Sequence, residues 1–235
     1  MAATYSPKLV TSGLVMCLDA GNRKSYPGTG SKWYDLSGNG YHFDLLNSPA
    51  FNSSDSGGTL SFTNSASQTA KYTSFPFAFA NGSFTIGITT YYIPATSNEG
   101  VLLCAAGGGI YNSGAVGLEA RFRGTSQIEY SVNDGIGSGI RLQSVPNNPW
   151  GGRWSMIWVR HTAQTSATLY DIGAPITTQS YSGEIASATT SDFYIGRGWD
   201  TYFNGKISTV HLYDRALSEN EILQNINATK GRFGL

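Results

Sequence analysis

The sequence predicts an all-β fold, an antiparallel two-sheet sandwich that ends in one short helix. Three observations lead to this prediction. Short apolar runs in which every second residue is apolar recur along the chain, separated by clusters of Gly, Ser, Asn and Pro. Helical periodicity is found only near the C-terminus. The 235 residues include 29 glycines and 13% aromatic side chains, whereas only 13% are charged, about half the usual share.

The first half of the chain contains strands with alternating apolar positions. They are expected at residues 13–21, 59–64 and 83–94. The run GLVMCLDAG, which opens this set, should have both faces partly buried. In the last of the three, Phe84, Ile86 and Ile88 fall on one face, and Pro94 ends the strand.

An antiparallel hairpin is predicted in the middle of the chain. In residues 115–124 the apolar side chains alternate with Gly117, Glu119 and Arg121. After the turn RGTS, residues 127–135 continue the same alternation. Two alternating runs joined by a short turn are typical of neighbouring antiparallel strands.

The last third of the chain contains the remaining strands. Residues 153–162 carry apolar side chains on both faces, including Trp154 and Trp158, which we expect in the core. Further strands are expected at residues 167–173, 192–198 and 205–215.

A single helix is predicted at residues 217–231. Ser218 and Glu221 have the spacing of a capping box, in which each side chain accepts the other residue's backbone N–H. Gly231 can end the helix. An apolar stripe lies between these signals, made of Ile222, Leu223 and Ile226.

Length and charge limit the function classes. No internal repeat or linker divides the chain, so we expect one domain over residues 1–235, with a core at about 10–228 and short terminal tails. The net charge is zero and the isoelectric point is near 6.8, which argues against nucleic-acid or anionic-membrane partners. No apolar run approaches the ~20 residues of a membrane span. The N-terminus lacks the basic-then-apolar order of a secretory signal.

Two cysteines, Cys17 and Cys104, lie inside apolar strand-like runs. We expect two buried free thiols, because free cysteine is among the most buried residue types. The sequence leaves a disulfide between them open.

Motifs at both ends of the chain carry a resemblance. Near the N-terminus a G-L-V-x-x-x-D strand leads to a W-x-D-x-S-G-N-x turn, within residues 13–62. Near the C-terminus, residues 193–226 contain an I-G-R strand, an F-N-G-K-I turn and a V-x-x-Y-x-R-A-L-S strand. These stretches resemble laminin-G-like, concanavalin A-like jelly-roll domains, and the resemblance implies that fold. Because the signature sits at both ends, strand 13–21 should pair with strand 205–215.

The family is a scaffold used by lectins, adhesion modules and glycosidases, so function has to be argued from sites. No glutamate has Asp two positions later, as the glucanase relatives do, and a cross-strand pair of Glu119 and Glu129 is expected to face solvent. The histidines, His42, His161 and His211, are scattered, and no G-x-S-x-G elbow is present. We therefore predict no catalytic residues and no enzymatic activity.

The loop WYDLSGNG raises the question of calcium. Asp35, Ser37 and Asn39 fall at every second position, like the first half of an EF-hand loop, but Leu46 stands where the bidentate Glu should be. Asp, Ser and Asn also build tight turns without an ion. We expect a structural turn, with a weak calcium site (joined by Asp200) or a ligand loop as alternatives. No other cofactor is expected.

Sugar binding requires exposed aromatic rings on loops, because the C–H face of a sugar stacks on a ring. Packing under a loop and contact with a partner protein remain alternatives for each ring. The candidate ligand-binding residues, for a glycan or a partner, are Trp33, Tyr34, Tyr41, Trp150, Trp199 and Tyr202.

A lectin-like scaffold without catalytic residues or an export signal resembles structural proteins of tailed-bacteriophage virions. This resemblance implies a virion surface protein, a capsid decoration or tail-fibre component, with host glycans as a candidate ligand. The alternative is a bacterial carbohydrate-binding or adhesion module at the cell surface or outside the cell; a glycan hydrolase ranks third. Apolar residues in the terminal tails predict contact with other virion proteins or a homo-oligomer, and the low charge predicts association that depends little on salt.

Overall fold

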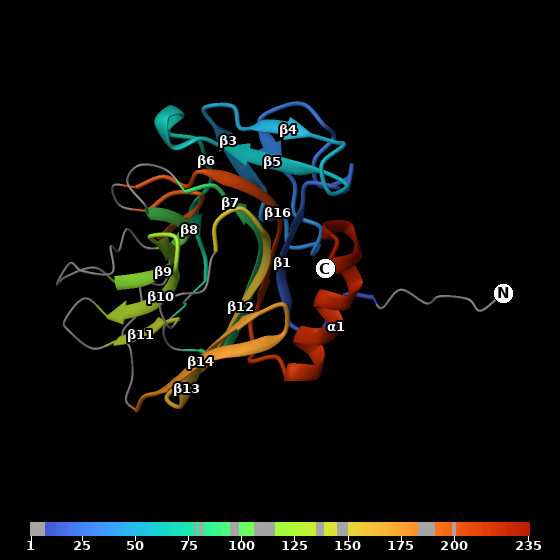
Figure 1. Cartoon of the computed structure of the whole chain (residues 1–235). Coiled ribbons are helices and arrows are strands. Elements are labelled where there is room, and N and C mark those ends of the chain that lie inside the picture. The colour runs from blue at the N-terminus through green and yellow to red at the C-terminus, as the bar shows by residue number, and fades with distance from the viewer. Residues whose placement is uncertain are drawn as a thin grey trace.

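The computed structural model describes residues 8–77, 79, 82–94, 99–105, 116–134, 139–144, 150–182, 191–198 and 201–235. Within these residues the chain forms two antiparallel sheets of eight strands each, and one α-helix lies outside one of them (Figure 1). The predicted all-β jelly-roll sandwich with one C-terminal helix is confirmed.

One sheet contains both ends of the chain. Its strands, in spatial order, are β14 (Ala174–Ser180), β13 (Ser166–Asp171), β12 (Trp154–Thr162), β7 (Phe84–Tyr92), β16 (Gly205–Tyr213), β5 (Thr59–Phe62) and β4 (Ala50–Asn52), with β1 (Leu14–Asp19) also paired to β16. β5 pairs with the first residues of β16, and β1 pairs antiparallel with the rest, from Leu14 opposite Tyr213 to Asp19 opposite Thr209. The predicted pairing of the first and last strands is confirmed.

The second sheet faces the first. Its strands, in spatial order, are β11 (Gly139–Gln143), β10 (Gln127–Asp134), β9 (Val116–Arg123), β8 (Glu99–Ala105), β15 (Ser191–Ile195), β6 (Thr69–Phe75), β3 (Phe43–Leu46) and β2 (Lys32–Trp33). β9 and β10 form the predicted hairpin, with Leu118 opposite Val132. A short 3-10 turn, η1 (Asn64–Ala66), joins β5 to β6.

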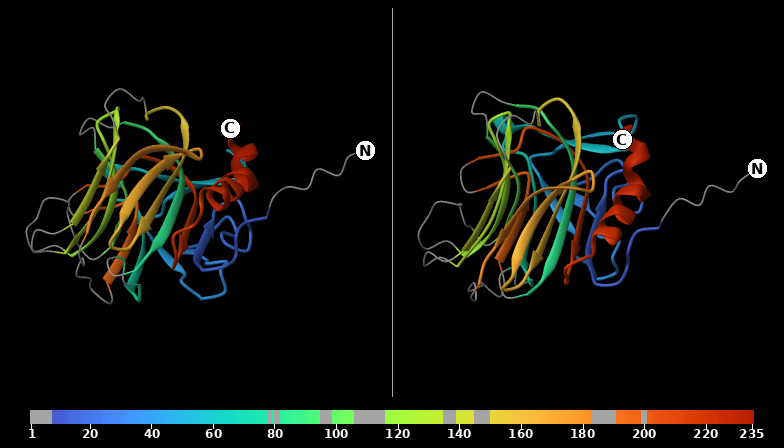
Figure 2. Two further views of the ribbon diagram at one scale, coloured as in Figure 1. Left: turned by 90° about the horizontal axis from the view of Figure 1, so that it is seen from below. Right: turned by 60° about the horizontal axis from the view of Figure 1, so that its bottom comes forward.

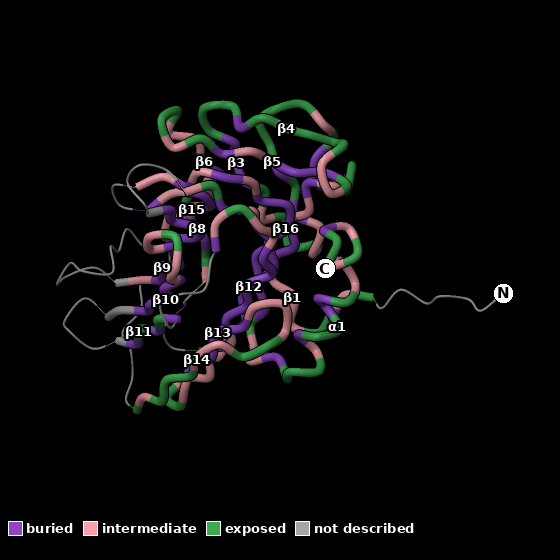
Figure 3. Tube along the Cα trace, viewed as in Figure 1, coloured by how far each residue is buried: buried purple, intermediate pink, exposed green. Residues whose placement is uncertain are grey.

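A continuous apolar core fills the space between the sheets. It runs from Met16 on β1 to Leu212 on β16 and includes the alternating positions of both sheets. Buried residues follow most of the strands, while exposed residues lie around β4, along the edge strand β14 and on the outer side of α1 (Figure 3). One close approach needs glycine: a Cβ at Gly87 of β7 would lie 2.5 Å from the ring of Trp158. Cys17 and Cys104 are buried thiols that form no disulfide, as expected, and burial raises the pKa of the Cys17 thiol to about 12.

A second, smaller core lies on the outer face of the first sheet, beneath α1 (Glu219–Thr229). Met156 and Trp158 point outward from β12 and pack with Ile222 and Ile226 of the helix. Both views in Figure 2 place the helix outside this sheet, away from β9–β11. Both faces of β12 are therefore covered, as its two apolar faces predicted, although Trp154 at its start is only half-buried.

The helix begins at the predicted capping box, but α1 ends at Thr229, two residues before the predicted end. The Ser218 backbone N–H donates to Glu221 Oε2 at 2.8 Å, and Glu221 N–H donates to Ser218 Oγ at 3.3 Å, which completes the capping box. Gly231 does not end the helix. The chain continues into a 3-10 turn, η2 (Lys230–Phe233), and Gly234 closes it with φ 69°. Leu223 is 39% exposed, so the apolar stripe is narrower than predicted.

The C-terminal segment is held by its own chain. Phe233 is buried against Trp154, with ring centroids 4.8 Å apart, so its apolar character needs no neighbouring subunit. Near the other end, the Val10 N–H donates to Asn225 Oδ1 of α1 at 2.8 Å. Residues 1–7, which include Tyr5 of the predicted contact tail, lie outside the described residues. In the described part of the chain, no helix has the length and apolarity needed to cross a membrane.

Candidate ligand-binding site

Asp35 is the centre of the loop that follows β2. Its Oδ1 accepts backbone N–H groups from Cys17 at 2.8 Å and Ser37 at 2.9 Å. Its Oδ2 accepts the Tyr41 N–H at 3.2 Å and lies 2.6 Å from the Ser37 hydroxyl. The carboxylate is buried, so these contacts replace water and fix the loop against β1.

The other two candidate calcium ligands serve the same loop. Ser37 Oγ lies 2.8 Å from the Val15 carbonyl oxygen, and the Asn39 amide donates to the same carbonyl at 2.9 Å. Asp200 lies outside the described residues. Among the residues that are described, no three His, Cys, Asp or Glu side chains gather as a metal site. These bonds support the interpretation of the segment as a structural turn.

Removal of calcium by EDTA is expected to leave the melting temperature unchanged. Asp35→Ala should lower it with or without EDTA, because the Cys17 and Ser37 N–H groups lose their acceptor, at about 1–3 kcal/mol. Differential scanning calorimetry measures both. A rise of several degrees on adding millimolar calcium, lost in Asp35→Ala, would contradict the structural-turn interpretation.

Two of the six aromatic candidates lie in the core rather than on the surface. Trp33 belongs to the edge strand β2 and is fully buried in the main core. Trp150 is also fully buried and packs against Phe122, with Arg153 4.8 Å from its ring. For these two rings the packing alternative holds, and neither offers a face to a sugar.

The remaining aromatic candidates are more accessible. Tyr34 is 39% exposed and meets His42 edge-on, with centroids 5.2 Å apart. Tyr41 is half-buried against Tyr72 and Phe75. Tyr202 is half-buried beside the guanidinium of Arg197. Trp199 lies outside the described residues.

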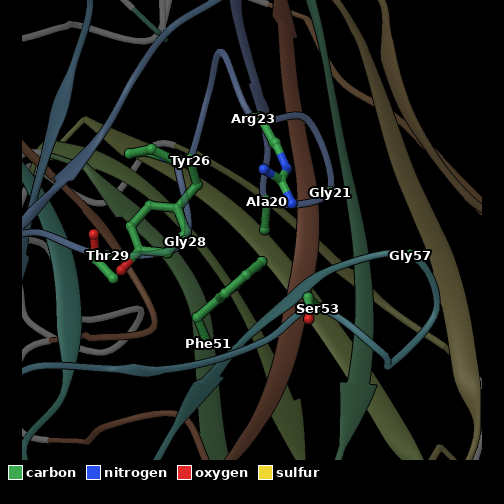
Figure 4. A pocket seen from close by; sticks show the side chains of 10 residues that line it. Ala20, Gly21, Arg23, Tyr26, Gly28, Thr29, Phe51, Ser53 and Gly57 are labelled. Atoms are coloured by element: carbon green, nitrogen blue, oxygen red, sulfur yellow. The ribbon is translucent and has the colours of Figure 1, made fainter.

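A cavity of about 500 Å³ opens between the loop after β1 and the segment from β4 to β5. We call it the Tyr26 cavity. Figure 4 shows Arg23, Tyr26 and Phe51 around it, with Thr29 and Ser53 at its edge. Its lining residues are Ala20, Gly21, Arg23, Tyr26, Pro27, Gly28, Thr29, Phe51, Ser53 and Gly57.

Aromatic rings form one wall of the Tyr26 cavity. Tyr26 and Phe51 meet edge-to-face, with centroids 5.0 Å apart. The Tyr26 hydroxyl donates to the Gly30 carbonyl at 3.1 Å, which holds its ring in place. Gly28 has φ 102°, a conformation that favours glycine. A Cβ added there would lie 3.6 Å from the Phe51 ring, in ordinary van der Waals contact.

Polar groups complete the Tyr26 cavity. Arg23 is exposed, and its guanidinium has no ion-pair or hydrogen-bond partner in the described part of the chain. Thr29 and Ser53 bring two exposed hydroxyls. A second cavity of about 480 Å³, lined by Gly30, Ser31, Leu45, Ser48 and Pro49, lies next to the first because Tyr26 lines both.

Sequence reasoning missed this cavity. The available signal was the run SYPGTG at residues 25–30, in which an aromatic residue precedes Pro and two glycines. Such a run predicts a turn, although the Tyr26 ring itself is buried. Phe51, the second ring of the wall, is 25 residues away and its proximity could not be read from the sequence.

The two strand glutamates are buried, so their predicted exposure to solvent is wrong. Glu129 is fully buried, and its Oε2 accepts from Arg121 Nε at 3.1 Å. Its Oε1 accepts from Arg141 and, at 3.2 Å, from Gln143. Glu119 lies on the same face, with an oxygen 3.6 Å from Arg121 Nε. The Glu129 oxygens are thus engaged with the protein, so they are not open to a substrate.

The histidines also have structural partners. Burial lowers the pKa values of His161 and His211 to about 4 each. His161 Nε2 lies 2.8 Å from the Tyr181 hydroxyl, and His211 stacks on Trp158. His42 Nδ1 accepts the Asp35 N–H at 3.1 Å. The three rings serve separate contacts and do not form a catalytic constellation.

Comparison with known proteins identifies relatives of the fold. A family model described as the concanavalin A-like lectin/glucanases superfamily matches residues 62–223. No curated protein matches the chain.

Solved structures with similar folds share little sequence. The binding domain of Paraclostridial Mosquitocidal Protein 1 has a TM-score of 0.70 and 17% identity, over 92% of this chain and 52% of that one. A botulinum neurotoxin serotype D ligand binding domain in complex with N-acetylneuraminic acid has a TM-score of 0.63 and 13% identity, over 92% of this chain and 51% of that one. Trypanosoma rangeli sialidase in complex with the inhibitor DANA has a TM-score of 0.66 and 18% identity, over 95% and 35%. This chain therefore spans about half or less of each of these structures.

Proposed function

Because this chain belongs to the concanavalin A-like lectin/glucanases superfamily, we propose that it is a binding module that takes up a glycan in the Tyr26 cavity. The observation that carries this proposal is the combination, around one cavity of about 500 Å³, of the half-buried Phe51 ring, the exposed Thr29 and Ser53 hydroxyls and the Arg23 guanidinium, which is unpaired in the described part of the chain. Ligand pockets are typically about 300–1,000 Å³, with apolar walls and a few polar groups that set orientation.

The chemistry of the Tyr26 cavity fits a sugar. The apolar C–H face of a pyranose ring can lie against Phe51, which is half-buried and so keeps part of its ring accessible. Sugar hydroxyls can exchange hydrogen bonds with Thr29, Ser53 and Arg23. Two of the similar structures were solved with N-acetylneuraminic acid or a sialidase inhibitor, which supports a glycan as the ligand class.

We further propose that the module is displayed on a bacteriophage virion, as a capsid decoration or tail-fibre component. The resemblance of its end motifs to virion structural proteins supports this, as does a glycan-binding fold without an identified catalytic constellation. The alternative is a bacterial adhesion module. Mass spectrometry of purified particles distinguishes the two, because a virion protein co-purifies with phage in many copies.

Substitutions in the Tyr26 cavity test glycan binding. Native protein is screened on a glycan array, and the best ligand is titrated by calorimetry against variants. Phe51→Ala and Arg23→Ala are each expected to weaken binding about tenfold, or ~1.4 kcal/mol, through loss of the stacking face or the cation. Ile93→Ala, an exposed apolar residue outside the cavity, is the matched control.

Two results would overturn the placement of the site. One is a glycan ligand whose affinity is unchanged in Phe51→Ala and Arg23→Ala. The other is loss of affinity in Tyr34→Ala alone, which would move the site to the loop after β2. If the native protein binds none of the glycans on the array, glycan binding itself is overturned.

A further inference from the structure

Arg197 lies between two tyrosine rings just after β15. Its guanidinium carbon is 4.8 Å from the centre of the Tyr194 ring and 5.5 Å from that of Tyr202. Arg197 and Tyr202 also form an isolated antiparallel bridge, which places their side chains on the same side. We call Tyr194, Arg197 and Tyr202 the Arg197 site.

The backbone around the Arg197 site is held by hydrogen bonds. The Gly196 N–H donates to the Leu102 carbonyl at 2.8 Å, and the Phe203 N–H donates to Gly196 at 2.9 Å. The Asn64 side-chain amide donates to the Tyr202 carbonyl at 3.0 Å. Both rings and the guanidinium therefore start from fixed backbone positions, which lowers the conformational entropy lost when a ligand binds.

In the described part of the chain, the acid that contacts these rings is Asp192, and it is already paired. Asp192 accepts from Lys71 at 2.7 Å and from the Tyr194 hydroxyl at 3.2 Å. Lys71 also lies 5.4 Å from the centre of the Tyr194 ring. In the described residues the Arg197 guanidinium has ring contacts but no carboxylate or carbonyl acceptor. Its five N–H donors lie in the guanidinium plane, so ring stacking does not use them.

We propose that the Arg197 site binds the anionic group of an acidic sugar, a carboxylate or a sulfate. The planar guanidinium matches the two oxygens of either group, and charge-assisted hydrogen bonds of this kind are roughly twice as strong as neutral ones. Among the described residues, the nearby pair of Lys71 and Asp192 is neutral in sum, and Arg197 adds one positive charge to it. The half-buried Tyr202 ring offers an apolar surface to the sugar itself.

This inference deepens the proposed function by naming a ligand class, and it rests on that function only for the sugar. The Arg197 guanidinium does not line the Tyr26 cavity, and separate observations support the Arg197 site. Binding at Arg197 does not require long-range electrostatic steering. A single short-range charge contact is compatible with the zero net charge of the chain.

The test is an NMR titration of the intact, isotope-labelled chain. Glucuronic acid and glucose 6-sulfate are the two anionic probes, and glucose is their neutral match. We expect the Arg197 Nε–Hε signal to move with one or both anionic probes and to stay in place with glucose. Whichever anionic probe moves the signal identifies the anion as carboxylate or sulfate.

Affinity measurements on variants complete the test. Arg197→Gln should weaken binding of the active probe about tenfold or more, which is ~1.4 kcal/mol per tenfold. Arg197→Lys keeps the charge but loses the planar fork of N–H donors, so its affinity for the probe should lie between those of the native protein and Arg197→Gln. Lys24→Gln removes one exposed positive charge elsewhere and should bind like the native protein.

The outcomes separate the two proposals. An unmoved Arg197 signal, or equal losses in Arg197→Gln and Lys24→Gln, overturns the Arg197 site and leaves the Tyr26 cavity standing. Anion-dependent movement of Arg197 with no neutral glycan bound at the Tyr26 cavity supports the Arg197 site and overturns only the proposed function.

Discussion

Acidification from pH 7 to pH 4 is expected to remove about 3 kcal/mol of stability for each of two buried histidines. Burial lowers the folded-state pKa values of His161 and His211 to about 4, against 6.5 in the unfolded chain. The unfolded state therefore binds protons that the folded state does not. Each depressed pKa therefore gives about 3 kcal/mol of stability above pH 6.5, at ~1.4 kcal/mol per pH unit between the two pKa values. This stability is lost as the pH falls towards 4.

The surroundings of each ring explain the shifts. His161 lies between the sheets, stacked on Phe84 with centroids 4.8 Å apart and an interplanar angle of 11°. His211 stacks on Trp158 at 5.7 Å and 13° beneath the helix layer. An imidazolium in either place would lose its hydration. At His211 this loss outweighs the attraction of Asp19, which Arg232 opposes.

Urea unfolding at pH 7, 5.5 and 4 measures this effect. His161→Gln and His211→Gln should each remove about half of the stability loss between pH 6.5 and 4, whatever their stability at pH 7. The Glu221 carboxylate adds to the loss at pH 4 but not at pH 5.5, because its bond to Arg215 lowers its pKa to about 2 and its contribution is lost as the pH falls below the unfolded value of 4.5. The comparison of the histidine variants between pH 7 and pH 5.5 is therefore free of this carboxylate. An imidazole that titrates near 6.5 in the folded protein would contradict this account.

Glu129→Ala is expected to lower the free energy of unfolding by about 3–5 kcal/mol, the usual cost of breaking a buried ion pair. Glu129 is fully buried between Arg121 on β9 and Arg141 on β11, and it accepts from both. Its removal leaves two neighbouring guanidinium groups without the anion that separates them. The change should be visible in urea unfolding at pH 7.

Two control variants show whether the stability loss in Glu129→Ala comes from the lost charge, from the lost side-chain volume, or from removing any carboxylate. Glu129→Gln keeps the side-chain volume and one acceptor oxygen, so its free energy of unfolding should lie between those of the native protein and Glu129→Ala. Glu219→Ala removes an exposed carboxylate at the start of α1 and should change stability by less than about 1 kcal/mol. A loss below that value in Glu129→Ala would contradict a structural role and would reopen this residue as a functional carboxylate.

Much of the fold was determined by local patterns in the sequence. The alternation at residues 115–124 and 127–135 correctly predicted the hairpin of β9 and β10, because the side-chain period of a strand is a local property. Ser218 and Glu221 correctly predicted the start of α1, since a capping box needs residues three positions apart. The end motifs correctly predicted that β1 and β16 are partners.

Burial and the candidate sites were decided by the tertiary structure. Trp33 and Trp150 flank turn residues, so the sequence left both packing and exposure open for them, and in the structure their rings enter the core. Glu129 was expected in solvent, but arginines on two neighbouring strands surround it.

The Tyr26 cavity and the Arg197 site have the same origin. Tyr26 meets Phe51, and Arg197 meets Tyr202, only because separate segments of backbone fold against each other. The sequence by itself determined several of the longer strands, their apolar faces and where the helix starts, but it did not predict β2, β3, β4, β6, β11 and β14. Which side chains lie over one another depends on contacts between distant segments, which no local period encodes, and so only the tertiary structure decided the sites.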